Sequence, residues 1–353
     1  MIDNAIKLLT GGGVLSRTGA RDTMDAIMSG DASPTQISAV LVALRMRGES
    51  PPELAGFAEG MRAHVLPVNA TRTDIVDTAG TGGDGADTFN ISTTAALVAA
   101  AAGAAVAKHG NRAVSSSSGS ADVLEALGFD IELPSARVAA SIDQLGFGFM
   151  FAPLHHPAMK YAAPVRRELG IRTVFNLLGP LTNPAGARRQ VIGVYEPELV
   201  PLMGAVLGEL GVERALVVHG AGGVDELTTL GPNTACLIEG TEVRDVQIDP
   251  ATLGFETGSL SELRGGTGAQ NATRTRSILM GEQGLARDTV VLNAAAALYM
   301  AGVTDDLAHG CDAAEGAIAD GRANSRLEEL IQFSNRTDDN DAARATPDTG
   351  ASA

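Results

Sequence analysis

The stretch DTAGTGGDGADTFNIST, residues 77–93, connects an expected strand to an expected helix. The apolar segment at 74–80 predicts a short strand that runs into glycines. The segment at 92–103 predicts a helix that is apolar on nearly every face and therefore buried. A glycine-rich turn between a strand and a helix presents backbone N–H groups at the positive end of the helix dipole. The stretch therefore indicates an α/β fold with an anion-binding turn.

Three glycines of this turn, Gly80, Gly82 and Gly85, match the G-x-G-x-x-G fingerprint of dinucleotide-binding sites. Two departures argue against a dinucleotide. Residues 86–89 separate the third glycine from the expected helix start, and the next strand ends in Lys-His at 108–109 rather than in the acid that binds a ribose hydroxyl. Polar side chains add hydrogen-bond donors at the helix start: Thr88, Asn90, Ser92 and Thr93. The turn therefore suits a phosphate group better than a dinucleotide.

A second loop, KHGNRAVSSSSGSADVLEALG at 108–128, follows the next expected strand. Lys108 and Arg112 supply positive charge, and Asn111 and the serines at 115–118 supply hydrogen-bond donors. On the serines alone, a solvated linker explains the segment equally well. Two such loops in consecutive βα units would instead hold a ligand with two anionic groups at one edge of the sheet.

Adjacent carboxylates, Asp225 and Glu226, follow another expected strand and a glycine loop. Such pairs are usually just exposed acids. Near a polyphosphate they would repel the ligand unless a cation intervened, and Mg²⁺ prefers a few carboxylates together with substrate phosphates. Ser92 could add a hydroxyl ligand, and Asp84 inside the glycine turn could bind ribose hydroxyls or metal-bound water.

Arg166 and Arg167 lie on one expected helix, where adjacent side chains point about 100° apart, so at most one faces a site. A guanidinium matches a planar carboxylate, but on the residues alone two solvated arginines are the commoner explanation. His155 and His156 lack the spacing of a metal pair, and His109 suits a base or a hydrogen-bonding role. The Walker A, nucleophile-elbow and HExxH motifs are absent.

Patterning along the chain predicts a small N-terminal α-helical domain at 1–71 and a larger α/β domain at 72–335 with a mostly parallel central sheet flanked by helices. The segment at 172–186 is apolar but interrupted by prolines, and we expect it to return to the helical domain. Residues 156–170 are expected to form one helix. The acidic, polar tail at 336–353 is expected to be disordered.

The net charge of the 353 residues is −16, which disfavours nonspecific nucleic-acid binding because that needs a basic surface. Lysine occurs only at positions 7, 108 and 160, so an acidic, lysine-poor surface adapted to high salt is one hypothesis; an acidic mesophilic enzyme is the other. No membrane span or signal segment is evident. Cys236 and Cys311 show no metal or disulfide spacing, which favours reduced thiols and a cytoplasmic location.

Four blocks together resemble the anthranilate phosphoribosyltransferase family of tryptophan biosynthesis: GTGGDGADTFNIST, KHGNRAVSSSSGSADVLEALG, RRELGIRTVFNLLGPLTNP and VDE. The resemblance covers about residues 2–333 in the family's order. It implies the fold of the class IV phosphoribosyltransferases, related to the pyrimidine nucleoside phosphorylases, and a homodimer formed through the helical domain. It also implies a Mg²⁺-dependent transfer of the phosphoribosyl group of phosphoribosyl pyrophosphate to anthranilate, with release of pyrophosphate.

The resemblance also implies roles for individual residues. Those that would hold the phosphoribosyl donor are Gly80, Gly83, Asp84, Thr88, Asn90, Ile91, Ser92, Thr93, Lys108, His109, Gly110, Asn111, Arg112, Ala113, Val114, Ser115, Ser116 and Ser120. Those that would contact anthranilate are Gly80, Asn111 and Arg166, and those that would bind Mg²⁺ are Ser92, Asp225 and Glu226. No essential base is implied, although His109 lies nearby and His156 could line the access channel. Ser117 departs from many relatives, which puts one peripheral charge in doubt.

Three other readings remain at the level of sequence. A nucleoside phosphorylase of the same fold would lack the Asn-Arg pair at 111–112 and the Asp-Glu pair at 225–226. A relative that binds nucleic acid or phosphate ligands without this activity would be favoured by a basic surface, and this chain is acidic. A non-enzymatic interaction module does not account for so many polar residues at strand ends.

Overall fold

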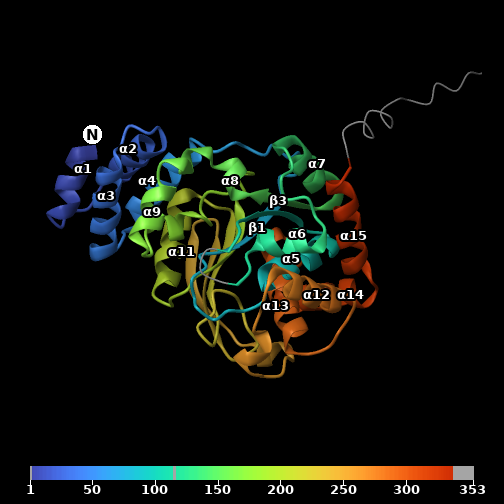
Figure 1. The fold of residues 1–353 in the computed structure, drawn as a ribbon. Coiled ribbons are helices and arrows are strands. Elements are labelled where there is room, and N and C mark those ends of the chain that lie inside the picture. The colour runs from blue at the N-terminus through green and yellow to red at the C-terminus, as the bar shows by residue number, and fades with distance from the viewer. Residues whose placement is uncertain (1, 114–116, 337–353) are drawn as a thin grey trace, which may run out of the picture.

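The structure, a computed structural model, describes residues 2–113 and 117–336. Four helices form a bundle at the N-terminal end, on the left of Figure 1: α1 (Ile2–Thr10), α2 (Arg17–Met28), α3 (Pro34–Arg47) and α4 (Pro51–Arg62). Helix α3 begins where the Ser-Pro pair predicts, because the Ser33 side chain accepts a backbone N–H of the first turn. It ends at Gly48, which has a φ of 86°. No helix of the described residues is long and apolar enough to cross a membrane.

Seven strands form the central sheet: β1 (Ile75–Gly80), β2 (Ala105–Gly110), β3 (Phe147–Phe151), β4 (Arg189–Gly193), β5 (Arg214–His219), β6 (Asn233–Glu239) and β7 (Glu242–Ile248). Their order is β3-β2-β1-β4-β5-β6-β7. Neighbouring strands from β3 to β5 in this order pair in parallel, and β6 and β7 join antiparallel. The mostly parallel sheet that the sequence predicts is confirmed, and the carboxyl ends of β1, β2 and β4 lie at one edge.

Helices flank this sheet: α5 (Ile91–Ala101), α6 (Ser120–Leu127), α7 (Ser135–Leu145), α11 (Leu199–Leu210), α12 (Gly268–Leu279), α13 (Leu285–Ala301), α14 (Leu307–Ala319) and α15 (Arg322–Ser334). In α5 every residue except Ser92 is buried, as its apolar sequence predicts. Helix α5 packs against α13, and both are rich in alanine, which allows a close approach of the two backbones. The start of α5 is thereby fixed in the interior, with Ser92 left accessible at the edge of the sheet.

The segment between β3 and β4 contains three short helices and a 3-10 turn: α8 (Ala152–His155), η1 (Pro157–Lys160), α9 (Ala163–Leu169) and α10 (Val174–Leu178). The prediction of one helix over 156–170 is wrong. Pro157 and Pro164 each lie in the first turn of a separate element, where the missing N–H costs little. The chain therefore changes direction at Tyr161–Ala162 before α9 begins.

The apolar residues of α10, including Phe175 and Leu178, belong to the same buried cluster as those of α1–α4. This cluster also contains residues of α11 and of β4, β5 and β6, and α11 lies between α4 and the sheet, so the bundle shares a core with one side of the sheet through α11. The Arg62 Nε donates a hydrogen bond to the carbonyl of Leu181 at 2.7 Å. Because the two parts share a core, the exact division at residues 71 and 72 stays a prediction.

Candidate active site

The glycine turn after β1 is shaped by a second segment that crosses it. A Cβ on Gly80 would collide with the carboxylate of Asp225, and a Cβ on the neighbouring Gly193 would collide with the backbone of Asp225. Gly82 and Gly83 have φ values of 65° and 79°, which favour glycine. The absence of side chains at 80 and 193 lets the acidic segment lie across the ends of β1 and β4. Gly193 was not singled out from the sequence, because no local motif marks it.

The two predicted metal ligands of this segment bind backbone donors. Asp225 Oδ2 accepts the N–H of Gly82 at 2.7 Å, and Glu226 Oε1 accepts the N–H of Ser92, in the first turn of α5, at 2.9 Å. Glu226 Oε2 is buried and has no hydrogen-bond partner among the described residues. A small cavity of about 20 Å³ is lined by Gly80, Ser92, Asp225 and Glu226, among other residues. The structure therefore brings the glycine turn, the start of α5 and the acidic pair together.

Electrostatics make this acidic pair unusual. Burial, and then repulsion by Asp84, raises the pKa of Asp225 to about 7. Burial and the neighbouring Asp225 raise the pKa of Glu226 to about 8. Asp84 itself accepts the backbone N–H of Asp225 at 3.2 Å, so a third carboxylate lies close to the acidic pair. Such a group needs a positive charge to stay ionised.

Lys108 is a basic residue that lies close to this acidic group. Its side chain is 1% exposed, and its Nζ donates to the carbonyl of Thr78 at 2.5 Å and to the hydroxyl of Ser92 at 3.3 Å. Burial lowers the pKa of Lys108, while the charges of Asp77, Glu226 and Asp225 oppose this effect. That Lys108 holds the donor stays a prediction; in the structure its Nζ lies beside the Ser92 hydroxyl, close to the acidic pair.

His109, at the end of β2, pairs with another histidine. Its Nδ1 lies 3.2 Å from the carbonyl of Gly179, and its Nε2 lies 3.2 Å from Nε2 of His156. Because the carbonyl can only accept, Nδ1 carries the proton, and His156 then donates to Nε2 of His109. Burial, and then the neighbouring His156, lowers the pKa of His109 to about 3. The ring is therefore neutral, with both nitrogens engaged, which suits a positioning role.

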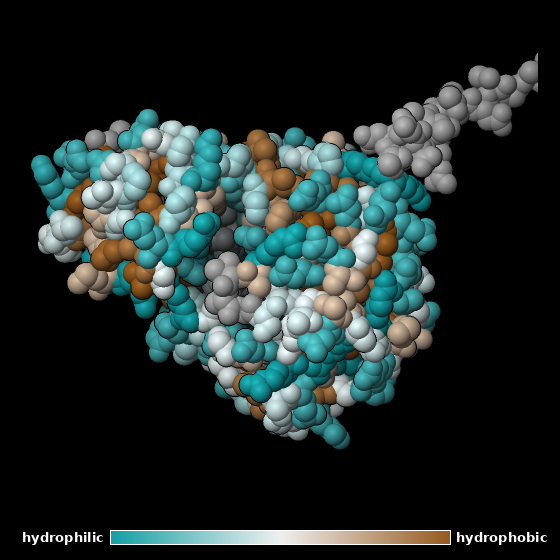
Figure 2. All heavy atoms as spheres, viewed as in Figure 1, coloured by the Kyte–Doolittle hydropathy of each residue, from teal (hydrophilic) through white to brown (hydrophobic). Residues whose placement is uncertain are grey.

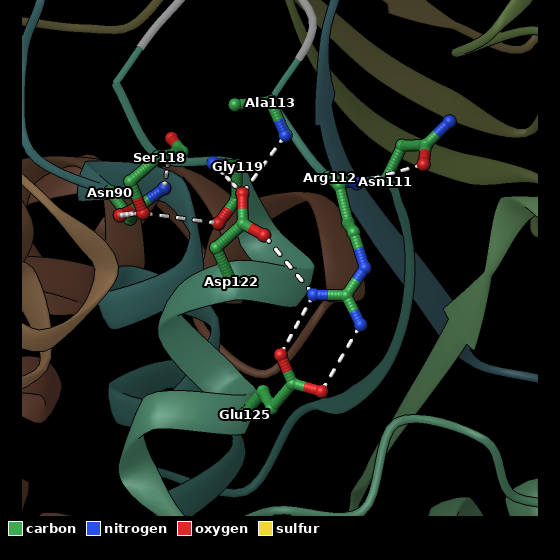
Figure 3. A network of polar contacts seen from close by, with 8 residues as sticks. All are labelled: Asn90, Asn111, Arg112, Ala113, Ser118, Gly119, Asp122 and Glu125. Carbon is green, nitrogen blue, oxygen red and sulfur yellow. Dashed lines mark hydrogen bonds and ion pairs between the residues drawn. The ribbon is translucent and has the colours of Figure 1, made fainter.

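The loop after β2 is joined to the start of α5. The side-chain amide of Asn90 donates to the carbonyl of Ser118 at 3.1 Å, and the Ser118 hydroxyl donates to Asn90 Oδ1 at 3.2 Å (Figure 3). The structure thus brings the two predicted anion-binding loops side by side. Asn271 of α12 also donates to Asn90 Oδ1, at 2.9 Å. Of the predicted donor-binding residues, Val114, Ser115 and Ser116 lie outside the described residues.

Arg112 does not point freely into this region. Its guanidinium donates to both carboxylate oxygens of Glu125, at 2.7 and 3.1 Å, and to Asp122 at 3.2 Å (Figure 3). Both acids lie on α6, and Figure 3 shows the arginine lying along this helix. A donor that used Arg112 would therefore compete with Glu125 for its N–H groups.

Thr88, near the end of the glycine turn, is held by a segment that the sequence analysis did not identify. Thr88 forms an isolated antiparallel bridge with Arg264, and the N–H of Phe89 donates to the carbonyl of Leu263 at 2.9 Å. These residues lie at the end of the 3-10 turn η3 (Leu260–Leu263). The contact is set by tertiary packing between distant parts of the chain, so no local pattern could have indicated it.

Arg166 of α9 is partly buried and has no ion-pair partner among the described residues. Its Cζ lies 5.1 Å from the centroid of the Phe175 ring, and burial lowers its pKa. A guanidinium without a carboxylate partner is available to an anionic ligand. Its neighbour Arg167 is exposed, as expected for adjacent helical residues. No hydrogen bond joins Arg166 to Gly80 or Asn111 within the described residues.

Arg172 connects the segment after α9 to the glycine turn. It donates a hydrogen bond to the carbonyl of Gly83, and its Cζ lies 4.0 Å from the centroid of the Tyr195 ring. Its Nη1 also lies 3.5 Å from Glu196. No local pattern in the sequence indicates a role for Arg172; in the structure it supports the glycine turn after β1.

Comparison with known proteins identifies the family. Residues 72–324 match the model of the glycosyl transferase family a/b domain, and residues 4–65 match that of the glycosyl transferase family helical bundle domain. The anthranilate phosphoribosyltransferase of Moorella thermoacetica is 50% identical over 333 residues, which cover 94% of this chain and 98% of the relative. That of Thermomicrobium roseum is 51% identical, covering 95% and 97%. The chain belongs to the anthranilate phosphoribosyltransferase family.

Solved structures of the anthranilate phosphoribosyltransferase family share the fold. The enzyme of Thermus thermophilus superposes with a TM-score of 0.90 at 47% identity, covering 94% of this chain and 99% of that one. The enzyme of Saccharomyces cerevisiae, solved in complex with PRPP and Mg, has a TM-score of 0.86 at 29% identity, covering 94% and 97%. The likeness extends over the helical bundle and the α/β domain together.

The residues of this family member fit a Mg²⁺ ion. Glu226 Oε2 is a buried oxygen without a partner among the described residues, and the Ser92 hydroxyl and the Asp225 carboxylate line the same cavity. No group of three or more His, Cys, Asp or Glu residues forms a metal cage within the described residues. Two carboxylates and a hydroxyl leave most of an octahedral shell to water or substrate phosphate, which is the usual way that proteins bind Mg²⁺.

Proposed function

We propose that this protein transfers the 5-phosphoribosyl group of phosphoribosyl pyrophosphate to the amine of anthranilate, giving N-(5-phosphoribosyl)anthranilate and pyrophosphate in tryptophan biosynthesis. The observation that carries the proposal is the acidic pair Asp225–Glu226 at the glycine turn, whose ionised form needs a cation. The family membership of the chain and the PRPP and Mg complex of the yeast relative support it. The chain is thus proposed to be a pentosyltransferase.

The proposed reaction separates pyrophosphate from C1 of the ribose through a transition state that resembles an oxocarbenium ion. Mg²⁺, when held by Ser92, Asp225 and Glu226, supplies positive charge against the departing pyrophosphate. Backbone N–H groups of the glycine turn and polar side chains of the two loops hold the phosphates and the ribose. Because these donors are fixed before the reaction, they stabilise the developing negative charge without reorganising.

The acceptor side of the site is proposed to use Arg166, with its planar guanidinium on the carboxylate of anthranilate. Asn111 and Gly80 would complete this side, between the donor and α9. The aryl amine already has a lone pair, so the chain must mainly hold it in line behind C1. His109 is proposed to line the site as a neutral ring, since its two nitrogens already bind Gly179 and His156.

We propose that the protein forms a homodimer through the helical bundle. Ala39, Val42, Ala43 and Met46 recur at helical spacing along α3 and line a groove of about 400 Å³ together with Leu9 of α1. Met46 is 84% exposed, and Figure 2 shows hydrophobic residues gathered at this end of the molecule. A second copy of the chain would bury this stripe. Light scattering of the wild type and of Met46→Arg tests this: we expect a dimer that the substitution weakens.

A cytoplasmic location is also part of the proposal. Cys236 and Cys311 are buried free thiols, and burial raises the pKa of both. Free thiols persist in a reducing compartment. Because the net charge is −16, activity in dilute buffer and in molar salt distinguishes the two explanations of the acidic surface.

The assay that tests the function mixes the protein with Mg²⁺, phosphoribosyl pyrophosphate and anthranilate, and follows the loss of anthranilate fluorescence. We expect loss of fluorescence that depends on all three components. The measurement is repeated in dilute buffer and in molar salt, which also separates the two explanations of the acidic surface. Absence of turnover under both conditions would refute the proposed activity.

A further inference from the structure

One carboxylate on α6 contacts both sides of the loop that follows β2. Asp122 Oδ2 accepts the backbone N–H of Ala113 at 2.9 Å and that of Gly119 at 2.8 Å (Figure 3). Its other oxygen, Oδ1, accepts an N–H of Arg112 at 3.2 Å. A single side chain therefore binds the chain where it leaves the strand and where it returns to the helix.

The two sides that Asp122 joins are in close contact. The N–H of Ala121 donates to the carbonyl of Asn111 at 3.2 Å. A Cβ on Gly119 would lie 2.5 Å from both the nitrogen of Ala113 and the carbonyl oxygen of Asn111, so only glycine allows the approach. We call these two facing segments, residues 111–113 and 119–121, the loop stem. Asp122 is the residue that satisfies N–H groups on both sides of it.

Capping of α6 does not account for all the contacts that the Asp122 carboxylate makes. A carboxylate near an anionic donor repels it, so the residue is unsuited to touching the donor itself. Burial would raise the pKa of Asp122, but the N–H groups of Ala113 and Gly119 and the guanidinium of Arg112 lower it overall. Its charge is thus matched inside the loop stem by Arg112 and by two backbone donors. Charge-assisted bonds of this kind are about twice as strong as neutral ones.

We propose that Asp122 is a positioning residue for donor binding: it closes the loop stem and thereby fixes Asn111, Arg112 and Ser118 relative to the start of α5. This inference rests on the proposed function, in which these residues hold the phosphoribosyl donor. The Asn90–Ser118 bonds connect the stem to α5, so opening the stem would displace one anion-binding loop from the other. Asp122 acts through other residues and does not contact the donor.

The matched control is Glu125, one turn further along α6. Its side chain is 55% exposed and binds Arg112 through both oxygens, but it has no bond to Ala113 or Gly119. Glu125→Gln keeps an amide oxygen that can accept from Arg112, so this arginine stays in place, and the variant leaves the loop stem closed. Asp122→Ala opens the stem, and Asp122→Asn keeps the shape of the side chain while removing its charge and one acceptor oxygen.

The experiment measures the KM for phosphoribosyl pyrophosphate, the KM for anthranilate and kcat for each variant, together with the Kd of the donor and Mg²⁺ by calorimetry without anthranilate. We expect Asp122→Ala to raise the donor KM and Kd about tenfold, Asp122→Asn to raise them less, and Glu125→Gln to change them less than about twofold. The anthranilate KM should stay within about twofold in all three. A purely structural role would lower the melting temperature and the active fraction without changing the donor KM.

Three outcomes separate the possibilities. Folded Asp122→Ala protein with an unchanged donor KM and Kd overturns the inference. If Asp122→Ala does not fold, Asp122→Asn decides, because it is isosteric with the wild type, and an unchanged donor KM and Kd in that variant also overturns the inference. If the wild type binds the donor but shows no turnover with anthranilate, the proposed function fails, and the calorimetric Kd values still decide the role of Asp122.

Discussion

Two pairs of acidic residues flank the predicted donor site, and their electrostatic situations are opposite. Asp122 and Glu125 lie on α6, and the guanidinium of Arg112 lowers the pKa of Glu125 and contributes to lowering that of Asp122. Asp225 and Glu226 form no ion pair with lysine or arginine among the described residues, and burial raises the pKa of both. The first pair is neutralised by an arginine of the protein, whereas the second has no arginine beside it among the described residues and is proposed to bind a cation.

This difference shows that the surroundings of two neighbouring carboxylates, rather than their spacing, decide whether they stay ionised. In the sequence both pairs appear as acids near a glycine-containing loop, and neither has a distinctive spacing. What separates them is a counter-charge: an arginine lies next to one pair, whereas among the described residues the buried Lys108, which also interacts with Asp77, is the basic residue near the other. A buried acidic pair without a neighbouring arginine is therefore a candidate for a metal site.

The largest effect should come from removing the charge of the second pair. We expect the double variant Asp225→Asn/Glu226→Gln to lose Mg²⁺-dependent turnover by at least about 100-fold, because the charge that stabilises the departing pyrophosphate is no longer held. Turnover is measured across a Mg²⁺ titration. Glu125→Gln, which removes an acid of the first pair, should stay within about twofold of the wild type. Equal losses in the two variants would contradict the distinction between the pairs.

The same contrast applies to the arginines. Arg112 is already bound to carboxylates, whereas Arg166 is partly buried without one. We expect Arg166→Ala to raise the KM for anthranilate about 10- to 100-fold, the value of a charge-assisted hydrogen bond or two, with little change in the donor KM. Arg167→Ala is the matched control, because Arg167 is the exposed neighbour on α9. An unchanged anthranilate KM in Arg166→Ala would remove this residue from the acceptor side.

In the metal-free protein, neutralising the two acidic pairs should change the free energy of unfolding in opposite directions. Raised pKa values in the folded state mean that Asp225 and Glu226 destabilise the metal-free protein at pH 8, where both are ionised in the unfolded chain. Asp225→Asn/Glu226→Gln should therefore raise the free energy of unfolding by about 1–3 kcal/mol in a chelating buffer. Asp122→Asn/Glu125→Gln should lower it, since those carboxylates have lowered pKa values. Urea denaturation measures both, and a shift of the same sign in the two variants would argue against the comparison.

Much of this architecture follows from the sequence, for a physical reason. The strands at 75–80 and 105–110 and the helix at 91–101 are apolar and bounded by glycines, so local pattern and burial agree. The individual bounds of helices α2, α7 and α12 could not be predicted, because polar or small residues interrupt their apolar spacing. Strand β7 was missed because it is an edge strand with mostly exposed residues.

The site divides in the same way. The closeness of Gly80, at the end of β1, and Asp225, in the loop after β5, could be predicted, because the carboxyl ends of parallel strands meet at one edge. Asn271, Arg172 and Gly193 could not be, since they act through tertiary contacts with residues far away in the sequence. The ion pair between Arg112 and Glu125 could not be predicted either. The spacing of the two residues becomes meaningful only once the loop stem brings α6 against the end of β2.

Buried histidines without a counter-charge should behave as the unpaired acids do and lose stability at the pH where they must become charged. Burial and the neighbouring His156 lower the pKa of His109 to about 3, and burial and His155 lower that of His156 to about 4, against about 6.5 in an unfolded chain. Between pH 6.5 and 4 the unfolded chain therefore binds protons that the folded protein does not. Stability should fall as the pH drops through this window, by up to about 1.4 kcal/mol per pH unit for each histidine.

His156→Gln removes one of these two titrating groups, and it also relieves the repulsion that holds the pKa of His109 down. The variant should therefore lose less stability than the wild type between pH 7 and pH 5, whatever its stability at pH 7. His64→Gln is the control, because His64 lies beside the carboxylate of Asp25, with Nε2 and Oδ1 2.7 Å apart. Urea denaturation midpoints at the two pH values give the slopes. If His156→Gln and the wild type lose stability with the same slope, burial without a counter-charge does not keep His109 and His156 neutral. The comparison with Asp225 and Glu226 then applies to acidic residues alone.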